Sequence, residues 1–464
     1  MNIERIRSVL ARTEGVSHWL LVTTEADATT VIRLPWVFSM RSGKLHADPN
    51  PHPREVITAP SETVTLRVFS RFAGDGEQWL GDAVGQVSSD DESALRRLVE
   101  SLVAGARSQR NKPFPLPDAD EPYASIPLAD AELEGLGHAA LVERAQAFTD
   151  RLVTAAGTLP GVGVSNIELF IHRSRSRLET SAGVKVEQRS TRVDVEACFL
   201  ARPETGPSGE HTARLHARRI ADIDPQAVAV TWGRAARAIA EAGPAPSVKG
   251  PVVLVGEACH DALRLVRSPL SFHASARMVH ERTSRHNPAE PIWGDAELKG
   301  EPLDLVSDPT LPFGLDSRRW TPTDGTACRA ATIAKDGHWA ELLGDRRYFH
   351  YLGLLERGVR ASGQAGNTVI PAGKTPEAGL LDGDCVVIQA FSDWGAEETS
   401  GDFSCEVRLG EVRRSGKVTP FRGGLLIGNW FAAMADARYS RETQTLGSYH
   451  GPRAVRFGNL TLAG

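Results

Sequence analysis

The sequence predicts an α+β protein, with an N-terminal α/β portion of helices on antiparallel strands and a C-terminal β-rich, barrel-like domain. In the first part of the chain, segments with helical periodicity alternate with segments that have the pattern of strands. From about residue 248 onward, short apolar runs recur between turns rich in Gly, Asp and Pro. A length of 464 residues is enough for two to three domains. We therefore expect an N-terminal α/β subdomain in residues 1–112, a second α/β subdomain in residues 118–245 and the β-rich domain in residues 248–464.

The first subdomain is expected to hold helices at both of its ends and strands between them. Apolar residues recur at helical spacing in residues 3–12, and residues 18–23 and 63–69 have the composition of strands. The polar residues 88–91 offer an N-cap before a further series of Leu and Val at helical spacing. The proline-rich residues 113–117 then indicate a linker.

The second subdomain is predicted to contain a hairpin flanked by helices. Apolar residues along one helical face predict a helix over residues 138–156, and Asp224-Pro225 is typical of a helix start. The small and polar residues 180–183 indicate a hairpin turn between strands. The strands expected around this turn cover residues 167–173, 177–180, 184–191 and 194–200.

The last domain is predicted to be rich in short strands. A buried strand is expected over residues 252–255, followed by a helix over residues 258–266. The regular spacing of the short apolar runs in this domain favours a closed or rolled β domain. The further strands expected here cover residues 330–333, 386–390, 403–409 and 425–428.

Composition excludes several classes of function. A net charge of −5 leaves no basic footprint for nucleic acid, and no apolar run approaches the length of a membrane span. Residues 1–7 open an amphipathic helix and lack the apolar segment of a signal peptide. The five cysteines are scattered and odd in number, which fits reduced thiols. We therefore expect a cytoplasmic protein with no membrane or nucleic-acid partner.

Three segments near the C-terminus carry a resemblance to a known family. They are Ser400-Gly401-Asp402-Phe403-Ser404, residues 420–430 with the sequence PFRGGLLIGNW, and residues 457–464 with the sequence FGNLTLAG. This pattern resembles the C-terminus of the TldD/PmbA family, the modulator of DNA gyrase-type metallopeptidases. The order of the predicted elements is similar to that of the family over nearly the whole chain. The resemblance implies a subunit of a metal-dependent peptidase.

The resemblance also separates metal-bearing from metal-free subunits. Metal-bearing members carry H-E-x-x-x-H directly after a Val-Val-Leu strand and a Cys near their end, which together form a zinc site with an open position for water. The matching segment here begins at Gly256 and ends at Asp261, so both His positions are changed, and residues 446–452 contain no Cys. The chain thus resembles a PmbA/TldE-like metal-free subunit. We expect no catalytic residue and no cofactor in this chain, with zinc in its partner.

The resemblance implies a heterodimer with a TldD-like subunit that carries H-E-x-x-x-H. The pair would act on unfolded or small peptides, or on peptide-derived amide intermediates such as those of natural-product biosynthesis. Ser400, Gly401, Asp402 and Phe403 are the candidate substrate-binding residues, because their backbone would line the peptide cleft. The alternative is that this segment is a Gly-mediated turn that only holds two strands together.

Two other functions remain open. A stand-alone, divergent metal-dependent hydrolase would use Glu257 and His260 for catalysis, with His260, His280 and His286 as metal ligands. However, a spacing of six residues turns the rings of His280 and His286 roughly 240° apart on a regular helix, so surface histidines are the simpler interpretation. The other alternative is a non-enzymatic, homodimeric binding protein of the same fold.

Overall fold

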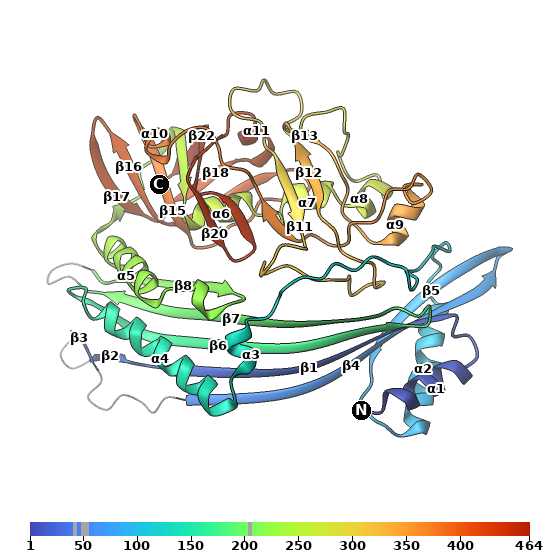
Figure 1. Ribbon diagram of the computed structural model, residues 1–464. Coiled ribbons are helices and arrows are strands. Elements are labelled where there is room, and N and C mark those ends of the chain that lie inside the picture. Colours follow the sequence, from blue (N-terminus) through green and yellow to red (C-terminus); the bar gives the residue numbers. More distant parts are fainter. Residues whose placement is uncertain (40–43, 48–54, 203–206) are drawn as a thin grey trace.

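The computed structural model describes residues 1–39, 44–47, 55–202 and 207–464. Its α+β class confirms the prediction, because helices pack on a long antiparallel sheet in the N-terminal part and short strands dominate the C-terminal part. In Figure 1 the long sheet forms a curved lower layer, and the C-terminal domain lies across one of its faces.

One six-stranded antiparallel sheet runs through the whole N-terminal part, in the order β5-β4-β1-β6-β7-β8. Strands from both sides of the linker at residues 113–117 pair with each other, since β1 lies beside β6. The ranges 1–112 and 118–245 therefore contribute to one sheet. Its strands are β1 (His18–Arg33), β4 (Glu55–Gly74), β5 (Glu77–Gln86), β6 (Val162–Thr180), β7 (Lys185–Ala201) and β8 (Gly209–Ala217), with a separate hairpin of β2 (Trp36–Ser39) and β3 (Lys44–Ala47).

Helices cover one face of this sheet. Leu21 of β1 packs with the first two helices, and Val31 of the same strand packs with α4, so these helices lie on the same side. The caps expected from the sequence are present, because Asp91 accepts a hydrogen bond from the backbone N–H of Ala94 and Asp224 accepts one from that of Gln226. The helices are α1 (Ile3–Arg12), α2 (Glu92–Arg107), α3 (Ala131–Gly135), α4 (His138–Ala156) and α5 (Pro225–Glu241), with a 3-10 turn at Ile220–Asp222.

The strands of the sheet are longer than the sequence predicted. The expected strands at 167–173 and 177–180 are one strand, β6, and those at 184–191 and 194–200 are one strand, β7. The predicted strands were interrupted at polar and charged residues, but the backbone hydrogen bonds between β6 and β7 continue through these residues. Arg175 forms an ion pair with Glu187 of the neighbouring strand at 2.8 Å, which keeps the polar stretch in register.

The C-terminal domain is built on a closed barrel of five strands. The pairing runs β15-β10-β22-β18-β16, and β16 also pairs with β15, which closes the ring. β17, β9 and β19 extend this sheet. The strands are β9 (Gly243–Pro244), β10 (Val248–Val255), β15 (Cys385–Phe391), β16 (Asp402–Arg414), β17 (Lys417–Arg422), β18 (Leu425–Asn429), β19 (Arg438–Tyr439) and β22 (Ala454–Ala463).

A second sheet and several short helices complete this domain. The sheet has the order β13-β12-β11-β14-β21-β20, and it shares one apolar core with the barrel. The strands are β11 (Leu305–Asp308), β12 (Ala331–Lys335), β13 (His338–Trp339), β14 (Asn367–Val369), β20 (Thr443–Leu446) and β21 (Tyr449–Pro452). The helices are α6 (Glu257–Leu263), α7 (Pro269–His273), α8 (Ala276–His280), α9 (Arg346–Tyr351), α10 (Glu377–Leu380) and α11 (Trp430–Met434).

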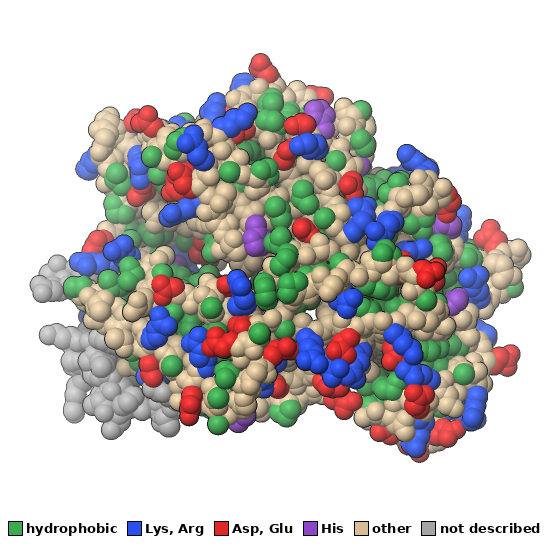
Figure 2. Space-filling model, viewed as in Figure 1, with side chains coloured by type: hydrophobic (Ala, Val, Ile, Leu, Met, Phe, Trp, Pro, Cys, Tyr) green, Lys and Arg blue, Asp and Glu red, His purple; other side chains and the backbone are tan. Residues whose placement is uncertain are grey.

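Polar contacts join the long sheet to the C-terminal domain. The buried guanidinium of Arg218 donates to the carbonyl oxygens of Gly314, Leu315 and Ser317, and the Tyr123 hydroxyl donates to that of Gly325 at 2.6 Å. On the outside, charges of both signs are interspersed over the face that Figure 2 shows. No helix in the described ranges is both long and apolar enough to cross a membrane.

Candidate functional site

The segment that matches the family's metal motif begins at a turn whose backbone conformation favours glycine. Strand β10 ends at Val255, and Gly256 turns the chain into α6 with a φ of 57° and a ψ of −118°. Its N–H donates to the Arg453 carbonyl oxygen at 2.9 Å, and its own carbonyl oxygen accepts from the Gln444 side chain at 2.8 Å. A Cβ at this position would meet no atom within 4 Å, but the backbone conformation disfavours any residue with a side chain. The glycine therefore suits this turn.

The structure brings this segment against residues 446–452, where metal-bearing members carry their Cys. Tyr449 is fully buried there, and its hydroxyl donates to the Pro452 carbonyl oxygen at 2.9 Å. Cys259 of α6 lies beside it, with its Sγ 3.4 Å from the same carbonyl oxygen and 3.9 Å from the Tyr449 hydroxyl. Burial raises the pKa of the Cys259 thiol to about 12, so it is a protonated core residue at neutral pH.

The acidic and basic side chains of α6 lie at its surface side. The Nδ1 of His260 is 3.1 Å from Oδ1 of Asp261, and the His260 ring packs edge-on against Tyr449, with 5.7 Å between ring centroids. The Glu257 side chain reaches solvent but is also crowded by protein. That partial burial, together with the charge of Asp261, raises the pKa of Glu257, while His260 and Arg408 oppose the shift.

These residues do not fit the zinc site of metal-bearing members. Such a site needs neutral imidazoles and a thiolate around an open position. Here the Cys259 thiol is protonated and directed at a backbone oxygen, and the His260 imidazole is held between Asp261 and Tyr449. The ring of His450, on β21, has its Nδ1 3.2 Å from the Thr445 hydroxyl. Within the described ranges, no group of three or more His, Cys, Asp or Glu residues could hold a metal ion. That this chain carries no zinc stays a prediction.

The candidate substrate-binding segment forms a tight, hydrogen-bonded loop at the start of β16. Asn429 Nδ2 donates to the Ser400 carbonyl oxygen and to Oδ1 of Asp402, each at 2.8 Å. Gly401 has a φ of 81°, and a Cβ there would lie 2.6 Å from the Phe431 ring. Phe403 is buried against Trp394, with ring centroids 5.0 Å apart, so its side chain belongs to the core. Ser400 and Asp402 reach solvent, and a role of this loop in substrate binding stays a prediction.

Trp430 connects this loop to α6. Its backbone N–H donates to the Gly401 carbonyl oxygen at 2.7 Å, and its indole N–H donates to the Ala262 carbonyl oxygen, also at 2.7 Å. One buried residue of the 420–430 segment therefore binds the 400–404 segment through its backbone and α6, directly after residues 256–261, through its side chain. The sequence identified each segment separately but held no signal for this contact.

The histidines of the alternative metal set lie in different surroundings. His280 packs against Tyr348 and Tyr351, whereas His286 packs against Trp339. His260 lies on Tyr449, so the three are not brought together within the described ranges.

His273 supports the 400–402 loop, a role that the sequence did not predict. It is 2% exposed, and its Nε2 lies 3.0 Å from the Thr399 carbonyl oxygen, directly before the loop. Its Nδ1 accepts from the Arg285 backbone N–H at 3.1 Å, which makes Nε2 the protonated nitrogen and donor of a neutral ring. Burial lowers its pKa. No local pattern marks this residue, because the contact spans distant segments.

Comparison with known proteins agrees with this architecture. Residues 249–464 match the family model described as the PmbA/TldA metallopeptidase C-terminal domain. An uncharacterized protein of Methanocaldococcus jannaschii, MJ0231, is 24% identical over 294 residues, which cover 61% of this chain and 66% of that protein. The chain thus matches slightly less than two thirds of this relative's length.

Solved structures share the fold along the whole chain. A Bacteroides thetaiotaomicron protein described as a candidate modulator of DNA gyrase has a TM-score of 0.76 at 15% identity, covering 99% of this chain and 98% of its own. TldE of Thermococcus kodakarensis has a TM-score of 0.74 at 13% identity, covering 99% of each chain. At these identities the solved structures show that the whole chain shares their fold. The C-terminal domain, residues 249–464, is the part of the chain that matches the PmbA/TldA metallopeptidase family model.

Proposed function

We propose that this chain is the non-catalytic, PmbA/TldE-like subunit of a heterodimeric zinc metallopeptidase. Its partner would be a TldD-like subunit with H-E-x-x-x-H, which would supply the zinc. The substrates would be unfolded or small peptides, or peptide-derived amide intermediates such as those of natural-product biosynthesis. The loop of Ser400, Gly401, Asp402 and Phe403 would line the peptide cleft through its backbone and the exposed side chains of Ser400 and Asp402.

One observation carries this proposal. The segments that would supply metal ligands in a metal-bearing member do meet here, but their meeting point is filled by Tyr449 and the protonated Cys259. Gly256 and Asp261 stand at the two His positions. A water-activating centre needs ligands with free electron pairs around an open position. A chain that keeps the scaffold without those ligands suits the role of a partner that shapes the cleft.

Reconstitution tests the proposal. This chain and a TldD-like chain that carries H-E-x-x-x-H are purified separately, then mixed and assayed for cleavage of an unstructured peptide. We expect cleavage only from the mixture, with zinc bound by the partner alone in elemental analysis. Replacing the partner's two motif histidines with Ala should abolish cleavage, while the matched variant His280→Ala of this chain should not. Full activity of the partner alone would contradict the proposal.

A second candidate, the stand-alone hydrolase, is favoured by one feature. Glu257 has a raised pKa next to His260, and a carboxyl group with such a shift can act in proton transfer. The stand-alone hydrolase hypothesis predicts zinc-dependent peptide cleavage by the purified chain alone, and loss of that cleavage in Glu257→Gln. The partner-subunit proposal predicts no cleavage by the purified chain alone. If neither the chain nor the mixture cleaves, and light scattering shows a homodimer, the non-enzymatic binding protein is the remaining function.

A further inference from the structure

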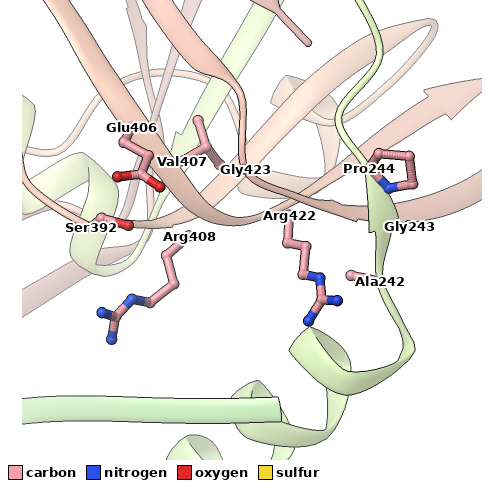
Figure 3. A pocket seen from close by; sticks show the side chains of 9 residues that line it. All are labelled: Ala242, Gly243, Pro244, Ser392, Glu406, Val407, Arg408, Arg422 and Gly423. Carbon is pink, nitrogen blue, oxygen red and sulfur yellow. The ribbon is translucent and has the colours of Figure 1, made fainter. Parts of the chain in front are cut away.

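A pocket of about 530 Å³ opens beside the barrel, next to the connection from α5 to β9. Residues of β16 and β17 form one side of it and the turn into β9 forms another (Figure 3). Arg422 and Gly423 belong to the family-like segment at residues 420–430, but none of the candidate catalytic, metal or substrate-binding residues lines the pocket. The lining residues are Ala242, Gly243, Pro244, Ser392, Glu406, Val407, Arg408, Arg422 and Gly423.

Two arginines direct their charges into this space. Arg408 lies on β16 and Arg422 on the neighbouring β17, and Figure 3 shows both side chains extending from the sheet to the same side. Within the described ranges neither guanidinium has an ion-pair partner. Their contacts are long hydrogen bonds to backbone oxygens, from Arg408 to Thr212 at 3.3 Å and from Arg422 to Ile239 at 3.5 Å. Most of the donor capacity of both groups therefore faces the pocket.

The charges of the lining favour a monoanion. Among the lining residues, Arg408 and Arg422 contribute two positive charges and Glu406 one negative charge, which leaves a single positive charge on the lining itself. The Glu257 carboxyl group outside the lining is also close enough to Arg408 for their charges to interact. His211, next to Thr212, adds none, because burial and Arg408 lower its pKa to about 4. A carboxylate offers two oxygens that match the planar fork of a guanidinium. A phosphate dianion would instead be repelled by Glu406.

The pocket also lies in line with the candidate substrate loop. Asp402, Ser404, Glu406 and Arg408 alternate along the accessible face of β16, while the residues between them are buried. At about 3.3 Å per residue, roughly 20 Å separates the loop from Arg408. This is the length of a short extended peptide.

We propose that Arg408 and Arg422 bind the terminal carboxylate of a peptide that lies along the accessible face of β16. The peptide class rests on the proposed function, and the carboxylate site rests on the pocket itself. Such a site selects free C-terminal ends over amides and internal segments, and it sets the direction in which the peptide lies.

Calorimetry on the purified chain tests this inference without any cleavage. The probes are N-acetyl-tetra-alanine with a free carboxylate and the same peptide as its carboxamide. We expect the acid to bind at least about tenfold more tightly, because charge-assisted hydrogen bonds are lost with the amide. Arg408→Gln and Arg422→Gln should each remove most of that preference, and Arg408→Lys, which keeps the charge, should retain part of it. Arg414→Gln, at the exposed end of the same strand, should leave the preference unchanged.

Three results would overturn the inference. They are equal binding of acid and amide, no binding of either, and displacement of the acid by inorganic phosphate as effectively as by acetate. Thermal unfolding of each variant shows that it is folded. Because the readout is the ratio of acid to amide in the isolated chain, it is independent of whether a mixture with a TldD-like chain cleaves peptides.

Discussion

Two regions of the C-terminal domain differ in whether their polar side chains are enclosed by protein or face open space. At the junction of α6 and β21, the Cys259 thiol and the Tyr449 hydroxyl are enclosed and both approach the Pro452 carbonyl oxygen. In the pocket at β16 and β17, the charges of Arg408 and Arg422 face open space. At the place of the family's metal motif, the thiol and hydroxyl groups thus have hydrogen-bond partners within the protein, whereas Arg408 and Arg422 keep donors that face the pocket.

Thiol reactivity is expected to give the largest contrast. With its pKa raised from 9.0 to about 12, Cys259 holds about a thousandfold less thiolate than an ordinary thiol at pH 8. Iodoacetamide at pH 8, followed by peptide mass spectrometry, should therefore leave Cys259 unmodified in the folded protein. The partly exposed Cys198 should react first, and urea should make both react. Rapid labelling of Cys259 in the native chain would show that the junction is open.

Truncation of Tyr449 should cost the most stability. Its ring is fully buried in the shared core, so Tyr449→Ala is expected to lower the free energy of unfolding by about 3–5 kcal/mol. Tyr449→Phe keeps the ring and removes only the hydrogen bond to Pro452, which should cost about 1 kcal/mol. Urea denaturation measures both. Similar losses from the two variants would mean that the hydroxyl, and not the packing, holds the junction.

A substitution in the loop at the start of β16 should lower the free energy of unfolding by less than the truncation of Tyr449. Gly401→Ala combines a left-handed backbone with a contact to Phe431, so we expect a loss of about 2–3 kcal/mol. Gly416, in the hairpin between β16 and β17, is a matched control, because its φ of 78° is similar but a Cβ there meets no atom within 4 Å. Gly416→Ala should cost about 1 kcal/mol. Equal losses in urea denaturation would rule out a steric role for Phe431.

The arginine pocket should contribute least to stability. Arg422 is only half-buried and has no ion pair within the described ranges, so Arg422→Gln is expected to change the free energy of unfolding by less than about 0.5 kcal/mol. A markedly larger loss would show that the guanidinium holds the two halves of the protein together. The contrast with the α6 junction would then disappear.

Elements with strong local signals could be predicted from the sequence. The helix over residues 138–156 coincides with α4, because an apolar face marks its length and glycines flank it. An N-cap within residues 88–91, which the structure places at Asp91, and the one at Asp224 were also predicted, since capping depends on neighbouring residues. The strands β6 and β7 were predicted in pieces, because cross-strand pairs such as Arg175 with Glu187 stabilise polar stretches that look like loops.

The candidate site was predicted less completely than the fold. The turn at Gly401 and the changed His positions at Gly256 and Asp261 follow from the residues in one segment. The contacts of Trp430 with Gly401 and Ala262 join segments far apart in the chain. Likewise, Arg408 and Arg422 share a pocket only because the hairpin of β16 and β17 packs near α5, which no local pattern encodes.

The position of β22 has a consequence for how the protein is made. This strand lies between β10 and β18, so the barrel cannot close until residues up to Ala463 have left the ribosome. β10 must wait through roughly two hundred residues of synthesis for its neighbour, and pairings over such separations form slowly. During that time its apolar Val252, Val253 and Leu254 lack β22, and until β15 has also been synthesised they lack both flanking strands. The nascent C-terminal domain is therefore expected to depend on chaperones more than the N-terminal sheet, which is complete once β8 has emerged.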